Sequence, residues 1–86
     1  MDIMELRNEL ANVDDEILKL FIRHLEITQQ IGREKAKEGK GLYDRKAEEE
    51  LLERVVADSP LGMQNFSIEL FRTIMSASKE YFAENK

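Results

Sequence analysis

Apolar residues recur along the first part of the chain at alternating spacings of three and four residues. Such alternation predicts a helix that packs along one face for most of its length, from about Asp2 to Lys37. At about 1.5 Å per residue this helix would be roughly 50 Å long, which exceeds the size of a compact domain of this mass. Either the rest of the chain folds back on it, or a second chain lies alongside. The apolar seam comprises Ile3, Leu6, Leu10, Val13, Ile17, Leu20, Ile27 and Ile31, with His24 among them.

The rest of the chain predicts two shorter helices. Residues 38–41 contain two glycines and no apolar side chain, so the first helix is expected to end there. Asp44 is expected to cap a second helix, and residues 48–50 place three glutamates near its positive end. Residues 58–62 end this helix, and a third is expected from about Gln64 to Ala83. The expected buried positions are Leu51, Leu52, Val55 and Val56 on the second helix, and Phe71, Ile74, Ser78 and Tyr81 or Phe82 on the third.

The composition limits the chemistry that is available. Residues 1–86 are expected to form one domain, since 42% of them are hydrophobic and 36% charged, as in soluble globular chains. With no cysteine and one histidine, the sequence excludes disulfides, thiolate nucleophiles, cysteine-based zinc sites and His-rich metal centres. It also lacks the glycine-rich motifs that bind dinucleotides and nucleotide phosphates. We therefore expect neither a metal nor a cofactor.

Charge and hydropathy predict where the protein acts. The net charge of −5 opposes binding to nucleic acid and to anionic membrane surfaces. No segment approaches the ~18 apolar residues of a membrane span. The first ten residues lack the basic and apolar regions of a signal peptide. We expect a cytoplasmic protein with neither nucleic-acid nor membrane partners.

The lengths of the helices predict the assembly. The second and third helices together are about as long as the first, so a single chain would leave much of the apolar seam half covered. Pairing two chains would bury the seam and would enlarge a core that is small at this chain length. The sequence therefore predicts an all-α fold of three helices, one long and two shorter, in an intertwined homodimer.

Polar residues interrupt the faces that are expected to be buried. His24 occupies a seam position, and Lys35 follows eleven residues later on the same face of the helix. Asp44 and Glu48 lie one turn apart, and Ser78 interrupts the stripe of the third helix. Each also has a structural explanation, such as a core hydrogen bond, a cap or an interaction with the helix dipole. Taken singly, none of these residues indicates a function.

Taken together, five segments resemble the all-helical chorismate mutases. The opening of the first helix matches the family over residues 6–10 (LRNEL) and 14–20 (DDEILKL), and its end matches over residues 31–35 (IGREK). The second helix matches over residues 43–52 (YDRKAEEELL) and the third over residues 71–78 (FRTIMSAS). The resemblance covers nearly the whole chain in one register, with matching loop lengths. It implies a homodimeric six-helix bundle that converts chorismate to prephenate, a committed step of aromatic amino acid biosynthesis in the shikimate pathway.

The resemblance also implies roles for particular residues. Arg7 of the other chain would bind a substrate carboxylate, and Lys35 would reach the ether oxygen and a carboxylate. Asp44 and Glu48 would hold the substrate hydroxyl, and Ser78 would contact the ring carboxylate end. Arg7, Lys35 and Glu48 are the implied catalytic residues. The full implied substrate-binding set is Arg7, His24, Ile31, Lys35, Asp44, Ala47, Glu48, Met75, Ser78 and Phe82.

The chain departs from the family pattern at three of these positions. His24 and Ala47 stand where the family carries arginines, and Phe82 stands where it carries Gln or Glu. Phe82 donates no hydrogen bond, and loss of one donor to a developing oxyanion typically lowers the rate about 10²–10³-fold. A protonated His24 is expected to replace one missing cation in part. We expect a chorismate mutase of weak activity.

Three alternatives stay open at this point. In the first, the chain is a catalytically reduced relative that binds or senses chorismate-like dianions, acting as a regulatory or ligand-binding domain. In the second, it is an enzyme with another reaction, like the isochorismate pyruvate-lyases that share the fold. In the third, it is a structural helical dimer. The fold does not separate these readings, because function depends on the site.

Overall fold

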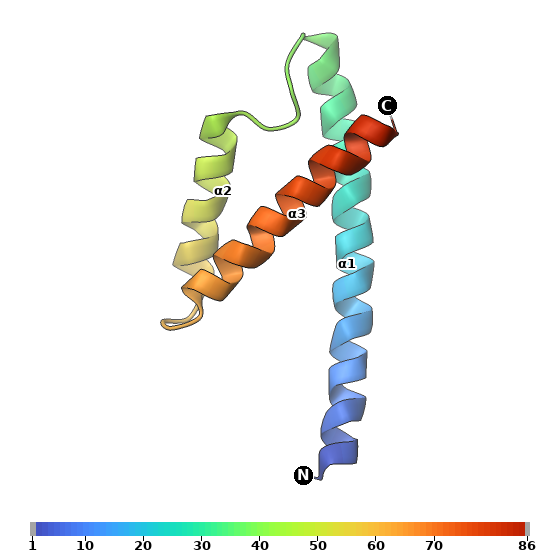
Figure 1. Ribbon diagram of the computed structural model, residues 1–86, viewed down its shortest axis with the longest axis vertical. Coiled ribbons are helices and arrows are strands. Elements are labelled where there is room, and N and C mark those ends of the chain that lie inside the picture. The colour runs from blue at the N-terminus through green and yellow to red at the C-terminus, as the bar shows by residue number, and fades with distance from the viewer. Residues whose placement is uncertain (1, 86) are drawn as a thin grey trace.

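The computed structural model describes residues 2–85, which form three helices and no strand (Figure 1). These are α1 (Ile3–Lys37), α2 (Arg45–Asp58) and α3 (Gln64–Glu84). The all-helical prediction is confirmed, and each helix begins and ends close to its expected residue. Across the same residues, no helix has an apolar stretch of the length that a membrane crossing requires.

Side-chain caps explain where α1 and α2 begin. The Asp2 carboxylate accepts a hydrogen bond from the backbone N–H of Glu5 at 2.8 Å. Asp44 does the same for α2, because its Oδ1 accepts from the Ala47 N–H at 2.7 Å. Such caps satisfy N–H groups that have no partner within the helix. Beyond the end of α1, Gly39 adopts a φ of +73°, which a residue with a side chain rarely does.

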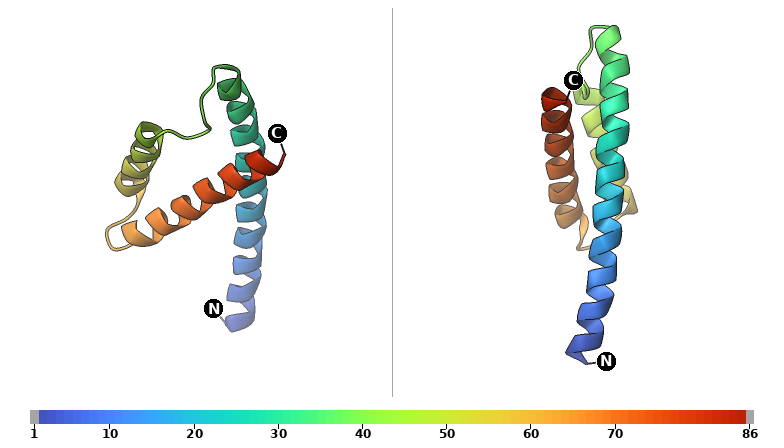
Figure 2. Two further views of the ribbon diagram at one scale, coloured as in Figure 1. Left: turned by 45° about the horizontal axis from the view of Figure 1, so that its top comes forward. Right: turned by 90° about the vertical axis from the view of Figure 1, so that its right-hand side faces the viewer.

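The third helix joins the other two. α3 crosses the C-terminal half of α1 at one end and packs against α2 at the other, and α1 and α2 make no helix contact of their own within residues 2–85. The N-terminal end of α1 projects beyond the rest of the molecule in all three views (Figure 2). The resulting shape is elongated and thin, with extents of 54 × 28 × 14 Å.

The single chain has a very small core. The buried apolar side chains are Leu42, Val55 and Met75, and the buried polar ones are Thr28 and Ser78. Of the four apolar positions expected to be buried on the second helix, only Val55 is fully buried, whereas the other three are partly exposed. The apolar seam of α1 lies largely in solvent. Its exposed members are Ile3, Leu6, Leu10, Val13, Ile17, Leu20, Ile27 and Ile31.

A glycine allows α3 to approach α1 closely. Gly32 is buried beneath the ring of Phe82, and a Cβ added to it would lie 2.8 Å from the Phe82 Cδ1 and Cε1 atoms. Such a distance is shorter than van der Waals contact, so only glycine fits without movement of the ring. Of the two aromatic residues considered for the stripe of α3, Phe82 therefore faces α1, whereas Tyr81 is 36% exposed.

Candidate functional site

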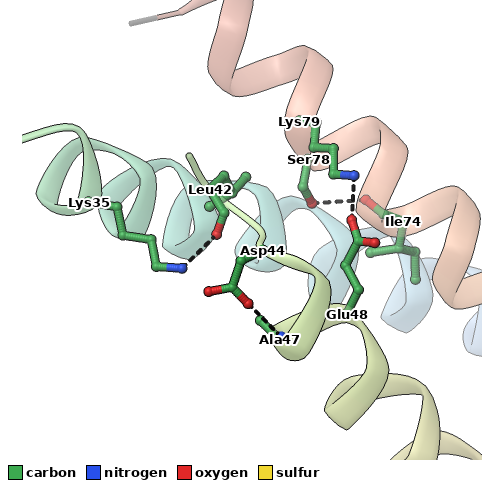
Figure 3. Close-up of polar contacts among 8 residues, drawn as sticks. All are labelled: Lys35, Leu42, Asp44, Ala47, Glu48, Ile74, Ser78 and Lys79. Carbon is green, nitrogen blue, oxygen red and sulfur yellow. Dashed lines mark hydrogen bonds and ion pairs between the residues drawn. The ribbon is translucent and has the colours of Figure 1, made fainter. Parts of the chain in front are cut away.

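Lys35 is held at the junction between α1 and the loop that follows it. Its Nζ donates a hydrogen bond to the backbone carbonyl of Leu42 at 3.2 Å, and Leu42 is buried. The Asp44 side chain lies on the same side of this loop, with the lysine pointing toward it (Figure 3). The backbone N–H of Ala47 lowers the pKa of Asp44, with a smaller contribution from the positive charge of Lys35. A cation from α1 therefore lies near enough to a carboxylate at the start of α2 to influence its pKa.

Glu48 forms an ion pair with a lysine of α3. The Lys79 ammonium donates a hydrogen bond to Glu48 Oε1 across the α2–α3 contact (Figure 3). The ammonium also lies 5.8 Å from the centre of the Tyr43 ring, within the range of a cation–π interaction. Glu48 and Lys79, with the buried Met75 between their helices, line a groove of about 430 Å³.

Ser78 is the most buried polar residue, at 1% exposure. Its hydroxyl donates to the Ile74 carbonyl at 2.9 Å and lies 3.3 Å from His24 Nδ1. Because a hydroxyl has one hydrogen, and that hydrogen goes to the Ile74 carbonyl, the Ser78 oxygen is the acceptor of a hydrogen bond from His24 Nδ1–H. Ser78 therefore has no proton left for a substrate carboxylate unless it releases the Ile74 carbonyl.

Burial opposes the expected protonation of His24. It lowers the pKa of His24 below its usual value of 6.5, because a charged imidazolium loses hydration against α3. The expectation rested on a neighbouring carboxylate that would raise this pKa, and the neighbour within reach is instead the hydroxyl of Ser78. The environment of His24 in the single chain therefore disfavours the charged form that would replace an arginine.

The lowered pKa of His24 predicts a dependence of stability on pH. The unfolded chain, with a pKa of 6.5, binds this proton more tightly than the folded chain. The free energy of unfolding therefore falls as the pH decreases from about 6.5 toward the lowered pKa, and His24 contributes no change above that range.

His24→Gln keeps a donor for Ser78 but does not titrate. In urea denaturation followed by circular dichroism, we expect this variant to lose less stability between pH 7.5 and 5.5 than the parent; equal losses would contradict the shift.

The other predicted site residues lie at three different places. Ala47 is partly buried in the first turn of α2, where its backbone N–H is held by Asp44. Ile31 and Lys35 line a shallow hollow of about 320 Å³ on α1. Phe82 packs on Gly32, so its ring fills the α1–α3 contact.

Arg7 is not brought to these residues within one chain. It lies in the second turn of α1, 28 residues before Lys35, which corresponds to about 42 Å along a helix. In a chain of this shape, Arg7 lies far from the Lys35 of the same chain.

Tyr43 and Lys79 lie beside the candidate residues, and the sequence pattern did not single them out. Both are next to residues that it did, since Tyr43 precedes Asp44 and Lys79 follows Ser78. On a helix, neighbouring residues point about 100° apart, so the stripe that contains Ser78 does not include Lys79. The length of its side chain takes the ammonium back to Glu48.

Comparison with known proteins places the chain in a family. The family model described as chorismate mutase type II matches residues 6–82, which include α2 and nearly all of α1 and α3. No curated protein and no solved structure matches the chain. The family match spans the whole set of candidate residues from Arg7 to Phe82 in one continuous segment. The chain therefore belongs to the chorismate mutase type II family, the all-helical class of these proteins.

Proposed function

We propose that this protein is a chorismate mutase that converts chorismate to prephenate slowly. The rearrangement is unimolecular and pericyclic, so it needs no nucleophile and no obligatory proton transfer. The protein has to hold a flexible dianion in its compact reactive conformer and to stabilise negative charge that grows on the ether oxygen. A site of oriented cations and hydrogen-bonding groups meets these requirements.

The observation that carries the proposal is that Lys35, Asp44 and Glu48 lie in one region beside α3 (Figure 3). Lys35 is anchored by the Leu42 carbonyl, and its ammonium has two more N–H groups for a substrate carboxylate and the ether oxygen. Asp44 and Glu48 lie one turn apart at the start of α2, where two acceptors suit the substrate hydroxyl. Because Lys35 comes from α1 and the two carboxylates from the start of α2, their common location supports a built site over a chance cluster of surface charges.

The proposed enzyme is a homodimer. The apolar seam of α1 lies in solvent in the single chain, and Leu20, for example, is 70% exposed. Burial of apolar surface stabilises a protein by about 25 cal/mol per Å², so a second chain on this seam would add a large favourable term to a very small core. An antiparallel partner would also carry its Arg7 toward the Lys35 end of α1, because the two lie about 42 Å apart on one helix.

We expect a low rate because three positions lack their usual groups. His24 is neutral and Ala47 has no polar side chain, so the site has fewer cations than the family pattern provides. Phe82 offers no donor to the ether oxygen, a loss that typically costs about 10²–10³-fold in rate. The Ser78 hydroxyl donates to the Ile74 carbonyl and lies against His24, which also weakens its contact with a substrate carboxylate.

The proposal is tested by chorismate turnover in the parent and in the His24→Arg/Ala47→Arg double variant. We expect measurable prephenate formation by the parent and a clearly higher kcat/KM for the double variant, since each arginine adds charge for the dianion. Phe82 is left unchanged because its ring packs on Gly32.

Thermal unfolding with and without chorismate is measured alongside turnover. Stabilisation without turnover in the parent would indicate a domain that binds the dianion and no longer converts it. Neither stabilisation nor turnover, in parent and double variant alike, would indicate a structural helical dimer and would overturn the proposal.

A further inference from the structure

Lys79 does not belong to the set of residues named from the family pattern, but its position suggests a role. Its ammonium lies beside the Glu48 carboxylate and faces the Tyr43 ring, between α2 and α3. The side chain is 49% exposed, so a ligand in the groove can reach it. We propose that Lys79 is a substrate-binding residue whose ammonium binds a carboxylate of the dianion. The inference rests on the proposed function.

The balance of charge at the site supports this role. The groove beside Lys79 is lined by three cations, Arg45, Arg72 and Lys79, and by two carboxylates, Glu48 and Glu49. Without Lys79 the two signs would be equal in number, and the groove would lose the positive excess that attracts a dianion. His24 does not correct this balance, because burial lowers its pKa and leaves the ring uncharged at neutral pH.

Lys79 also lies near the turn of α2 where the family carries an arginine and this chain has Ala47. Ala47 is the residue immediately before Glu48 on α2, and its methyl group occupies little space there. Lys79 reaches Glu48 from the neighbouring helix and so brings a positive charge to the same turn of α2. One of its three N–H groups is used on Glu48, and the others are available to a ligand oxygen.

Tyr43 positions this ammonium. The centre of its ring lies 5.8 Å from Lys79 Nζ, and the residue is partly buried. An aromatic face on one side and a carboxylate on the other hold a flexible lysine in one place before the substrate arrives, which lowers the entropy lost on binding.

The test compares Lys79→Met with Lys79→Arg and with Lys46→Met as a matched control. Lys46 lies on the first turn of α2 and pairs loosely with Glu50 at 3.9 Å, with 85% of its side chain exposed. We expect Lys79→Met to raise the KM for chorismate at least about tenfold with a smaller change in kcat. Lys79→Arg and Lys46→Met should stay within about threefold of the parent KM.

Two further measurements separate ligand binding from a structural role. Added NaCl should raise the KM of the parent more steeply than that of Lys79→Met, because the variant has lost the charge that salt screens. Ala47→Arg should restore the KM when it is combined with Lys79→Met. Circular dichroism checks the fold of each variant, and Lys79→Gln replaces Lys79→Met if the latter does not fold.

The outcomes distinguish this inference from the proposed function. An unchanged KM in Lys79→Met, in a parent that turns over chorismate, would overturn the role of Lys79 alone. An equal rise in KM in Lys46→Met would do the same, since it would show a general effect of surface charge. A parent that neither converts chorismate nor is stabilised by it would overturn both proposals together.

Discussion

Replacing Lys35 by methionine is expected to lower kcat/KM for chorismate by at least about 100-fold, the largest effect of any single substitution considered. The Lys35 ammonium is the anchored cation of the α1 end of the site, and it is oriented by the Leu42 carbonyl at 3.2 Å. Methionine keeps the length and apolar stem of the side chain but has no charge and no donor. Turnover of chorismate by purified parent and variant measures the effect.

Lys37→Met provides the matched control for this experiment. Lys37 lies two residues later on α1, and its ammonium pairs with Glu34 on the exposed surface. Surface pairs of this kind contribute about 0–1 kcal/mol, so neither activity nor stability should change greatly. If Lys35→Met kept the parent's kcat/KM, or if Lys37→Met lost as much activity, the assignment of Lys35 to the reaction would be wrong.

Two inactive variants are expected to recover activity when they are paired in one dimer. Arg7→Ala and Lys35→Met should each inactivate a homodimer, because every site would lack one of the two cations. In a heterodimer of the two variants, one site would lack both cations and the other would have both. With one intact site of two, we expect about half the activity of the parent dimer. The 28 residues between Arg7 and Lys35 on one helix are the reason for expecting a shared site.

The heterodimer is made by expressing both variants together with different affinity tags and purifying on each tag in turn. Each variant purified alone gives the baseline, and a mixture of the two purified homodimers controls for exchange of chains. Activity of the doubly purified protein no higher than that baseline would show that Arg7 does not act across a dimer. Size-exclusion chromatography of the parent gives the oligomeric state independently.

Local sequence signals predicted the helices well because they act over a few residues. The capping side chains of Asp2 and Asp44 and the glycines at 39 and 41 mark ends that the structure places close to the expected residues. A shared role of Lys35, Asp44 and Glu48 was implied by the family resemblance alone, because their nearness depends on the fold and on no local pattern.

Contacts between helices were harder to predict from the sequence. The packing of Phe82 on Gly32 joins residues 50 positions apart, and no local pattern encodes it. The charge of His24 depends on burial against α3 and on the neighbour that the fold supplies, and burial disfavours the cation that the sequence led us to expect. Lys79 was missed for the same reason, because its partner Glu48 lies 31 positions away.

Because α3 lies between the other two helices, its packing determines how precisely Lys35 and Glu48 are positioned relative to each other. Lys35 on α1 and Glu48 on α2 have no direct helix contact to fix their separation, so two successive packings, α1 on α3 and α3 on α2, set it instead. A shift in either contact would change the distance between the Lys35 ammonium and the Glu48 carboxylate. Gly32 beneath Phe82 and the buried Val55 therefore affect the spacing of groups that they never touch. Selection for a particular substrate geometry would act on such packing residues as well as on the residues that bind the substrate.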